Sequence, residues 1–136
     1  MRTRKFSLLC LLLLVAACPA WALKILHGPY LQNLGEREVT IVWVSDKPSI
    51  GWAELAPDDD THFYAQERPK FYDTKIGIKH TSRVHTVKLT GLNPGTHYRY
   101  RVCAQEVVSH KGHKVMYGDI VTDFNYSKGA LTFRTN

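Results

Sequence analysis

The residues best suited by type and spacing to hold a metal ion are His110 and His113, which flank Lys111-Gly112. Two imidazoles three residues apart can share a metal ion when a helix or a tight loop points them together. No cysteine or carboxylate stands between or directly beside them to complete a tetrahedral ligand set. We therefore interpret residues 109–114 as a polar hairpin loop and predict no metal site there.

The run Asp58-Asp59-Asp60 is the next candidate for chemistry. Calcium loops space their oxygen ligands around a glycine turn, and this pattern is absent here, so a solvated turn is the better interpretation. No serine or cysteine lies in a recognisable nucleophile elbow, and no glycine-rich loop that could hold a phosphate leads from a strand into a helix. These residues do not predict an enzyme.

Residues 85–102 predict two strands joined by a tight turn. Both flanks alternate apolar and polar residues with a period of two, which is typical of half-buried strands. The turn contains two glycines, which tolerate positive φ, and a proline, which removes a donor. In a β-sandwich, a leucine fills the end of the core at such a corner, and a tyrosine hydroxyl bonds back to the turn backbone. We assign this corner to Leu92, Pro94, Gly95 and Tyr98.

The same alternation places three arginines. If the tyrosines of the second strand face the core, Arg99 and Arg101 face outward, and a last strand at 130–135 adds Arg134 to the same sheet face. Such a face could dock a partner domain or bind an acidic ligand. Trp52 could stack under one of the arginines if it also points outward. The alternative is a sheet face that is merely solvated.

The remaining pattern also predicts strands and no amphipathic helix. Residues 39–45 alternate most regularly, and we place Trp43 in the core with its strand neighbours, because a large aromatic side chain anchors a sandwich. We expect a turn at 46–49, a strand at 50–55, and short edge strands at 62–65 and 71–74. Two further strands at 102–108 and 115–121 flank the hairpin loop. The prediction is an all-β, antiparallel β-sandwich.

Several of these segments together resemble a known family. They are the corner itself, Gly28-Pro29-Tyr30-Leu31-Gln32, the strand VTIVWV (39–44), the run YRYRVCAQEV (98–107) and the closing LTFRT (131–135). They are similar to the domain that precedes the catalytic domain in purple-acid-phosphatase-like and other calcineurin-like metallophosphoesterases. The resemblance spans residues 24–135. It implies an immunoglobulin/fibronectin type III-like antiparallel sandwich with an accessory, non-catalytic role.

The resemblance also implies where chemistry would reside. In the family's catalytic domain, Asp, His and Asn ligands hold two metal ions that clamp a phosphoryl group and activate a water. The Gly-Asn-His motif of that domain does not occur here, and Gly118-Asp119, the only Gly-Asp pair, falls in a predicted turn. We carry no metal ligand over to this chain, and expect no enzymatic activity and no cofactor. A dinuclear metal centre is expected only in the missing catalytic domain. The chain stops at Asn136, which favours a truncated metallophosphoesterase.

Residues 1–22 predict a secretion signal: a cationic start, an apolar stretch, and the cleavage site Ala20-Trp21-Ala22. The apolar stretch is shorter than the roughly 20 residues that span a membrane. Val15-Ala16-Ala17-Cys18 also resembles a bacterial lipobox, in which Cys18 would be lipidated. Cleavage after Ala22 is favoured because Pro19 follows the cysteine. Either route predicts export of a domain at 23–136, periplasmic or extracellular, or lipid-anchored on the outer surface.

The net charge and the cysteine content limit the classes of partner that this chain could bind. Without the three cations of the signal, the formal charge falls from +6 to +3, with no Lys/Arg run, which argues against nucleic-acid binding. Cys103 is the only cysteine beyond the signal; we expect a loop to cover it, the alternative being an exposed thiol that dimerises in air. The expected partner is a phosphoesterase catalytic domain, and a membrane only if Cys18 is lipidated. The alternative function is a stand-alone extracellular binding or adhesion module, which a groove lined with exposed aromatics would support.

Overall fold

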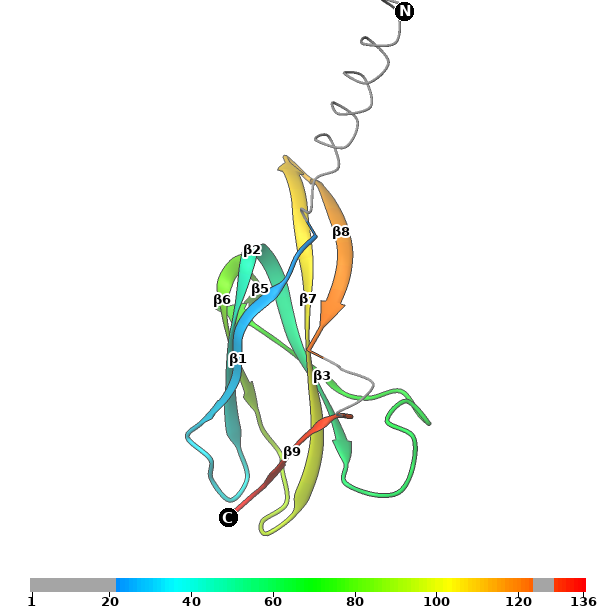
Figure 1. Ribbon diagram of the computed structural model, residues 1–136. Helices are drawn as coiled ribbons and strands as arrows, with labels where there is room; N and C mark the ends of the chain where they lie inside the picture. Colours follow the sequence, from blue (N-terminus) through cyan, green and yellow to red (C-terminus); the bar gives the residue numbers. More distant parts are fainter. Residues whose placement is uncertain (1–21, 124–128) are drawn as a thin grey trace, which may run out of the picture.

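The computed structural model describes residues 22–123 and 129–136. The predicted signal, with Cys18 and most of the cleavage site, lies outside the described residues. No helix in the part of the chain that the structure describes is long and apolar enough to cross a membrane. The prediction of an all-β, antiparallel fold is confirmed (Figure 1).

The strands of the described residues follow the chain in this order: β1 (Ile25–Gln32), β2 (Val39–Pro57), β3 (Lys70–Tyr72), β4 (Thr74–Lys75), β5 (Ile78–Lys79), β6 (Ser82–Leu89), β7 (His97–Lys111), β8 (Lys114–Thr122) and β9 (Leu131–Arg134). β4 and β5 form a small separate hairpin. All pairings are antiparallel, and β1, β2, β7 and β8 are successive neighbours.

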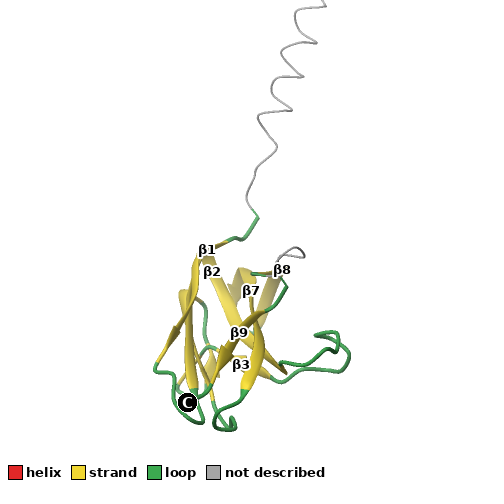
Figure 2. Ribbon diagram, turned by 60° about the horizontal axis from the view of Figure 1, so that its bottom comes forward, coloured by secondary structure: helices red, strands yellow, loops and turns green. Residues whose placement is uncertain are grey.

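The long strand β2 belongs to both layers of the sandwich. Its first half pairs with β1 and β6, and its second half pairs with β3 and β7. β7 in turn pairs with β9 near its start and with β8 over its remainder. The two layers therefore share one strand, which bends where it passes from one to the other (Figures 1 and 2).

The bend in β2 differs from the predicted turn at 46–49 followed by a separate strand. The extended conformation continues through the segment, with a register shift between Val44 and Ser49. Backbone pairing holds it: the Asp46 N–H donates to the Lys24 carbonyl at 2.9 Å, and the Asp46 carboxylate accepts from the Lys24 N–H at 2.8 Å. Such partners outside the segment leave no local sequence signal.

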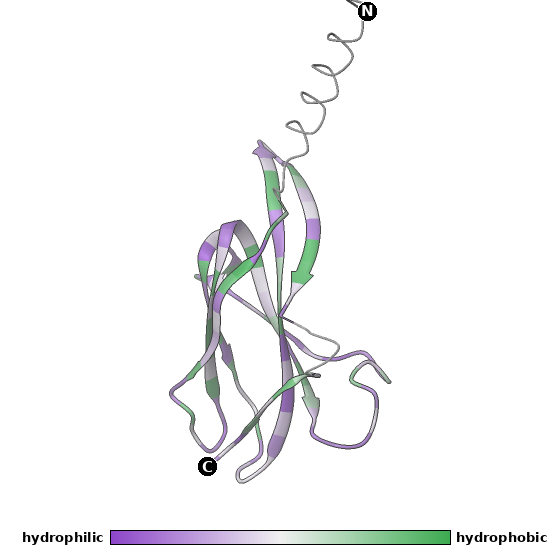
Figure 3. Ribbon diagram, viewed as in Figure 1, coloured by the Kyte–Doolittle hydropathy of each residue, from purple (hydrophilic) through white to green (hydrophobic). Residues whose placement is uncertain are grey.

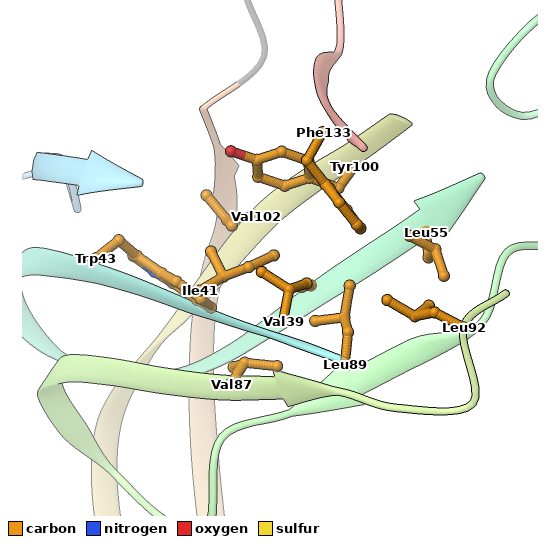
Figure 4. Packing of buried hydrophobic residues seen from close by; sticks show 11 residues of the cluster. Val39, Ile41, Trp43, Leu55, Val87, Leu89, Leu92, Tyr100, Val102 and Phe133 are labelled. Atoms are coloured by element: carbon orange, nitrogen blue, oxygen red, sulfur yellow. The ribbon is translucent and has the colours of Figure 1, made fainter. Parts of the chain in front are cut away.

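The core lies between the layers and is built from alternate residues of the strands. Trp43 is fully buried, as are Val39 and Ile41 on the same face of β2 (Figure 4). The second half of β2 contributes Ala53 and Leu55. The other core residues come from β6, β7, β9 and the corner: Val87, Leu89, Leu92, Tyr100, Val102 and Phe133. Period-two patterning thus places one apolar face of each layer inward.

The segment between β2 and β3 is less regular than predicted. Residues 62–65, expected as an edge strand, form turns, whereas the strand expected at 71–74 is present as β3. Residues 58–69 therefore form one loop, called the covering loop below. The predicted hairpin around 109–114 is present as β7 and β8, with Gly112 at φ +60° at its tip.

Candidate functional site

The corner between β6 and β7 is a structural device. The Tyr98 hydroxyl accepts a hydrogen bond from the Asn93 N–H at 2.9 Å, and Leu92 is buried in the end of the core. Gly95 has φ +58°, which favours glycine. Its N–H donates to the Asn136 carbonyl at 2.9 Å, and Tyr98 stacks on Phe133 of β9 with 5.5 Å between ring centroids. The corner therefore fixes the last strand.

Among residues 22–123 and 129–136, no three His, Cys, Asp or Glu side chains gather as a metal site would need. His110 and His113 are both exposed at the hairpin tip. Asp60 and His62 lie two residues apart, but both side chains are exposed on the covering loop. Gly118-Asp119, interpreted from the sequence as a turn, lies inside β8.

Arg99 and Arg101 lie on the outer face of β7, where the alternation places them, and the covering loop lies over both. Arg99 donates to the carbonyls of Pro57 and Thr61 at 2.7 and 2.8 Å and lies 3.1 Å from the Asp59 carboxylate. The buried Arg101 guanidinium lies 4.8 Å from the ring centroid of Tyr64.

Arg134 is therefore the only exposed member of the three predicted arginines. Trp52 also points to this outer face, as its pairing with Cys103 shows, but the cation over its ring is Lys70 at 5.8 Å. The covering loop therefore covers this part of the outer face.

The covering loop also seals a buried carboxylate and the single cysteine beyond the predicted signal. The Tyr64 hydroxyl donates to Glu54 at 2.6 Å, and the Cys103 thiol donates to the same carboxylate oxygen at 3.5 Å. Burial and the neighbouring Glu54 charge raise the pKa of Cys103 to about 12, so it is a thiol at neutral pH. Of the two predicted states, the covered thiol is confirmed.

Sequence reasoning missed a buried chain of three polar side chains beneath β3. Nε2 of His85 lies 2.9 Å from the Ser49 hydroxyl, and its Nδ1 lies 3.2 Å from the Asp73 carboxylate. One feature of the sequence could have revealed the burial of His85. In the alternation of β6, it falls on the same face as the core residues Val87 and Leu89. A polar residue in a core register requires partners.

The three hydrogen-bonded side chains have the atoms of a Ser-His-Asp triad. A substrate cannot reach them, because Ser49 and His85 have no exposed surface. Burial lowers the pKa of His85, against the opposing effect of Asp73. The neutral ring donates from Nδ1 to Asp73 and accepts from Ser49 at Nε2. Gly51 makes room for it, since a Cβ there would lie 2.5 Å from Nδ1. These hydrogen bonds hold Asp73, and with it the end of β3, against the core.

Beside the covering loop, the outer face of the layer formed by β3, the second half of β2, β7 and β8 opens into a cavity of about 310 Å³. Its aromatic members are Trp52, Tyr72 and Tyr117, from β2, β3 and β8. Its remaining lining residues are Ile50, Lys70, Lys79, Gln105 and Ile120. We call it the aromatic–lysine groove. Along β7 and β8, hydrophobic and hydrophilic residues alternate in bands (Figure 3). Tyr117 and Ile120 are 52% and 58% exposed.

Comparison with known proteins agrees with this architecture. The family model described as the purple acid phosphatase N-terminal domain matches residues 28–115, which run from the middle of β1 to the start of β8. No curated protein matches the chain at a significant level. Because the family model covers more than half of the sequence, this chain belongs to the purple acid phosphatase N-terminal domain family.

Proposed function

We propose that the chain is a non-catalytic, exported accessory module of a metal-dependent phosphoesterase and acts by packing against a catalytic domain. The observation that carries the proposal is the family match across the sandwich. The lack of a metal-ligating cluster among the described residues supports it. The dinuclear chemistry that hydrolyses a phosphoester would then reside in the partner domain.

The corner end of the sandwich is the proposed contact with that domain. The Asn136 N–H donates to the Gly35 carbonyl at 3.1 Å, and its side-chain amide donates to Leu34 at 2.9 Å. A domain following β9 would start from an anchored residue, beside the exposed Arg134. Contacts there would be made by turns rather than by the groove.

The first experiment is to read the DNA downstream of the codon for Asn136 in all frames. We expect a Gly-Asp and a Gly-Asn-His motif, as in a truncated or interrupted metallophosphoesterase. The encoded catalytic domain is then expressed separately and titrated with this chain. We expect binding that Arg134→Ser weakens, while Arg83→Ser, an exposed arginine at the start of β6 and so at the end of that strand away from the corner, leaves it unchanged. Equal weakening by both variants, or no binding, would contradict this contact.

Catalysis and export have separate tests. Incubated with divalent metals and p-nitrophenyl phosphate, the purified chain should release no more nitrophenol than a metal blank; hydrolysis above the blank would contradict the non-catalytic role. For export, the cell fraction is determined, and protein labelled with a fatty acid is compared with Cys18→Ser. Absence of label with a new N-terminus at Leu23 supports cleavage after Ala22. Label lost in Cys18→Ser supports the lipid anchor, and retention of residues 1–22 inside the cell contradicts both.

A further inference from the structure

One wall of the aromatic–lysine groove is cationic. The Lys79 ammonium lies 3.8 Å from the ring centroid of Tyr72, and the Lys70 ammonium lies 5.8 Å from that of Trp52. Among the described residues, no carboxylate forms an ion pair with either lysine, and no acidic side chain lines the groove. Lys70 is the cross-strand partner of Glu54, whose buried carboxylate accepts from Tyr64 and Cys103. The two ammonium groups therefore lie over rings, and neither forms an ion pair within the described residues.

The other wall is apolar. It is formed mainly by Tyr117 and Ile120 of β8, both more than half exposed, with the half-buried Ile50 beside them. The lysines lie over the rings of Trp52 and Tyr72, so the free apolar surface is on the β8 side. Gln105 also lines the groove, and its amide nitrogen donates to the Gly118 carbonyl at 3.1 Å.

The floor adds an unsatisfied donor. Trp52 is only 6% exposed, and its indole N–H has no hydrogen-bond partner among the described residues. Buried donors are normally paired, but this N–H is itself enclosed, so it belongs to the floor beneath the groove and not to its open surface. The cations on one side favour an anion, and the β8 side favours a flat apolar body.

We propose that the aromatic–lysine groove binds a small organic anion in which a ring is joined to a phosphate or carboxylate group. The anion pairs with Lys70 and Lys79, and the ring packs on Tyr117 and Ile120. A cavity of about 310 Å³ holds a ligand of one ring with its anionic group. The site lies away from the corner and does not depend on the proposed docking of a catalytic domain.

The test is a titration of the full chain, labelled with nitrogen-15, followed by the tryptophan indole N–H signals in NMR. Phenyl phosphate and benzoate are the probes, with benzyl alcohol and inorganic phosphate as the neutral and ring-free counterparts. We expect both ring anions to move the Trp52 signal, while the Trp43 signal from the core stays in place. Each counterpart should bind about fivefold more weakly or worse, since it lacks one of the two contributions.

The two anions distinguish the natural class of ligand. Tighter binding of phenyl phosphate assigns the groove to a phosphomonoester, and tighter binding of benzoate assigns it to a carboxylate. Equal binding of benzyl alcohol and phenyl phosphate would overturn the proposal, because the lysines would then play no part. A Trp52 signal that none of the probes moves would overturn it as well.

Variants locate the site. Lys70→Met with Lys79→Met should weaken phenyl phosphate about fivefold or more. The matched control, Lys111→Met with Lys114→Met, removes two exposed charges at the hairpin tip and should leave the affinity unchanged. Tyr117→Ala should reduce the preference for phenyl phosphate over inorganic phosphate. An unchanged Trp43 signal shows that each variant is folded. Equal loss in both lysine pairs would mean long-range attraction rather than a site.

Discussion

The outer face of the layer formed by β3, the second half of β2, β7 and β8 has two halves that treat their cations differently. In the covered half, the covering loop lies over Arg99 and Arg101 and supplies a carbonyl, a carboxylate and a ring. In the open half, Lys70 and Lys79 lie on aromatic rings and have no anionic partner among the described residues. The first half is completed by the chain itself, and the second is left for a ligand.

The difference has a physical cause in the covering loop. Arg68 is buried and donates to the carbonyls of Phe63 and His62, so it fixes the loop from within. Phe63 is thereby held against the arginines of β7. A planar guanidinium has five donors to satisfy and suits such enclosure, whereas a lysine ammonium is compact, strongly hydrated and mobile. The contrast indicates which cations are structural.

The largest difference in the free energy of unfolding is expected when one cation in each half is replaced by alanine. Arg101→Ala should lower the free energy of unfolding by about 3 kcal/mol, because it empties a buried space and removes the cation beside Tyr64. Lys70→Ala should change it by less than about 0.5 kcal/mol, because Lys70 is exposed. Urea unfolding of the two variants measures both values. Similar losses would remove the distinction between the halves.

A matched pair of tyrosines sharpens the comparison. Tyr64→Phe should cost about 2 kcal/mol, since the buried Glu54 carboxylate loses the hydroxyl that donates to it. Tyr117→Phe in the open half should be neutral within about 0.5 kcal/mol. The rate at which a thiol reagent modifies Cys103 gives a second readout, because loosening of the covering loop should expose it. Unchanged labelling and stability in Tyr64→Phe would mean that the loop is held by other contacts.

Acid should weaken the floor of the open half through His85, which holds Asp73 next to Tyr72. Its pKa is lowered by burial, so below about pH 6.5 the unfolded chain binds a proton that the folded chain does not. Stability due to His85 is therefore full above pH 6.5 and falls as the pH drops toward the folded pKa. The slope is at most about 1.4 kcal/mol per pH unit, because one proton is involved.

Unfolding measured between pH 8 and pH 5.5 tests this effect and avoids most carboxyl titration. Ser49, Asp73, Trp43 and Gly51 surround the ring, and Nε2 of His80 lies 3.6 Å from the Asp73 carboxylate. His85→Gln should flatten the slope, while the exposed His97→Gln should not. If His85→Gln does not fold, an NMR titration of the native His85 ring replaces it. A ring that protonates above pH 6.5 would reverse the predicted sign.

The smallest effects separate the remaining arginines. Arg99→Ser should cost about 1 kcal/mol through its hydrogen bonds to the covering loop. Arg134→Ser should change stability by less than about 0.5 kcal/mol, because its side chain is exposed. Thermal or urea unfolding can resolve this difference. An Arg134 variant that destabilises more than the Arg99 variant would mean that the end of β9, rather than the covering loop, depends on its arginine.

The sequence was most informative where the constraints are local. Alternation along β2, β6 and β7 placed Trp43 and Tyr100 in the core, and turn chemistry located the corner at Leu92 to Tyr98. The same alternation put Arg101 on the outer face correctly but could not reveal that a loop from about 40 residues earlier covers it. The groove likewise depends on β3 and β8 meeting the same strands, and the bend in β2 depends on Lys24. Such long-range contacts have no local pattern.

The alternation of β7 has a further consequence for how this protein can evolve or be engineered. Within a few residues, the strand supplies Tyr100 and Val102 to the core and Arg101 and Cys103 to the outer face. Inserting or deleting one residue would exchange all of these between the two environments. Length change is therefore forbidden along the paired strand and is permitted at the exposed tip around Gly112. A peptide epitope or tag can be grafted there while the register beneath it stays fixed.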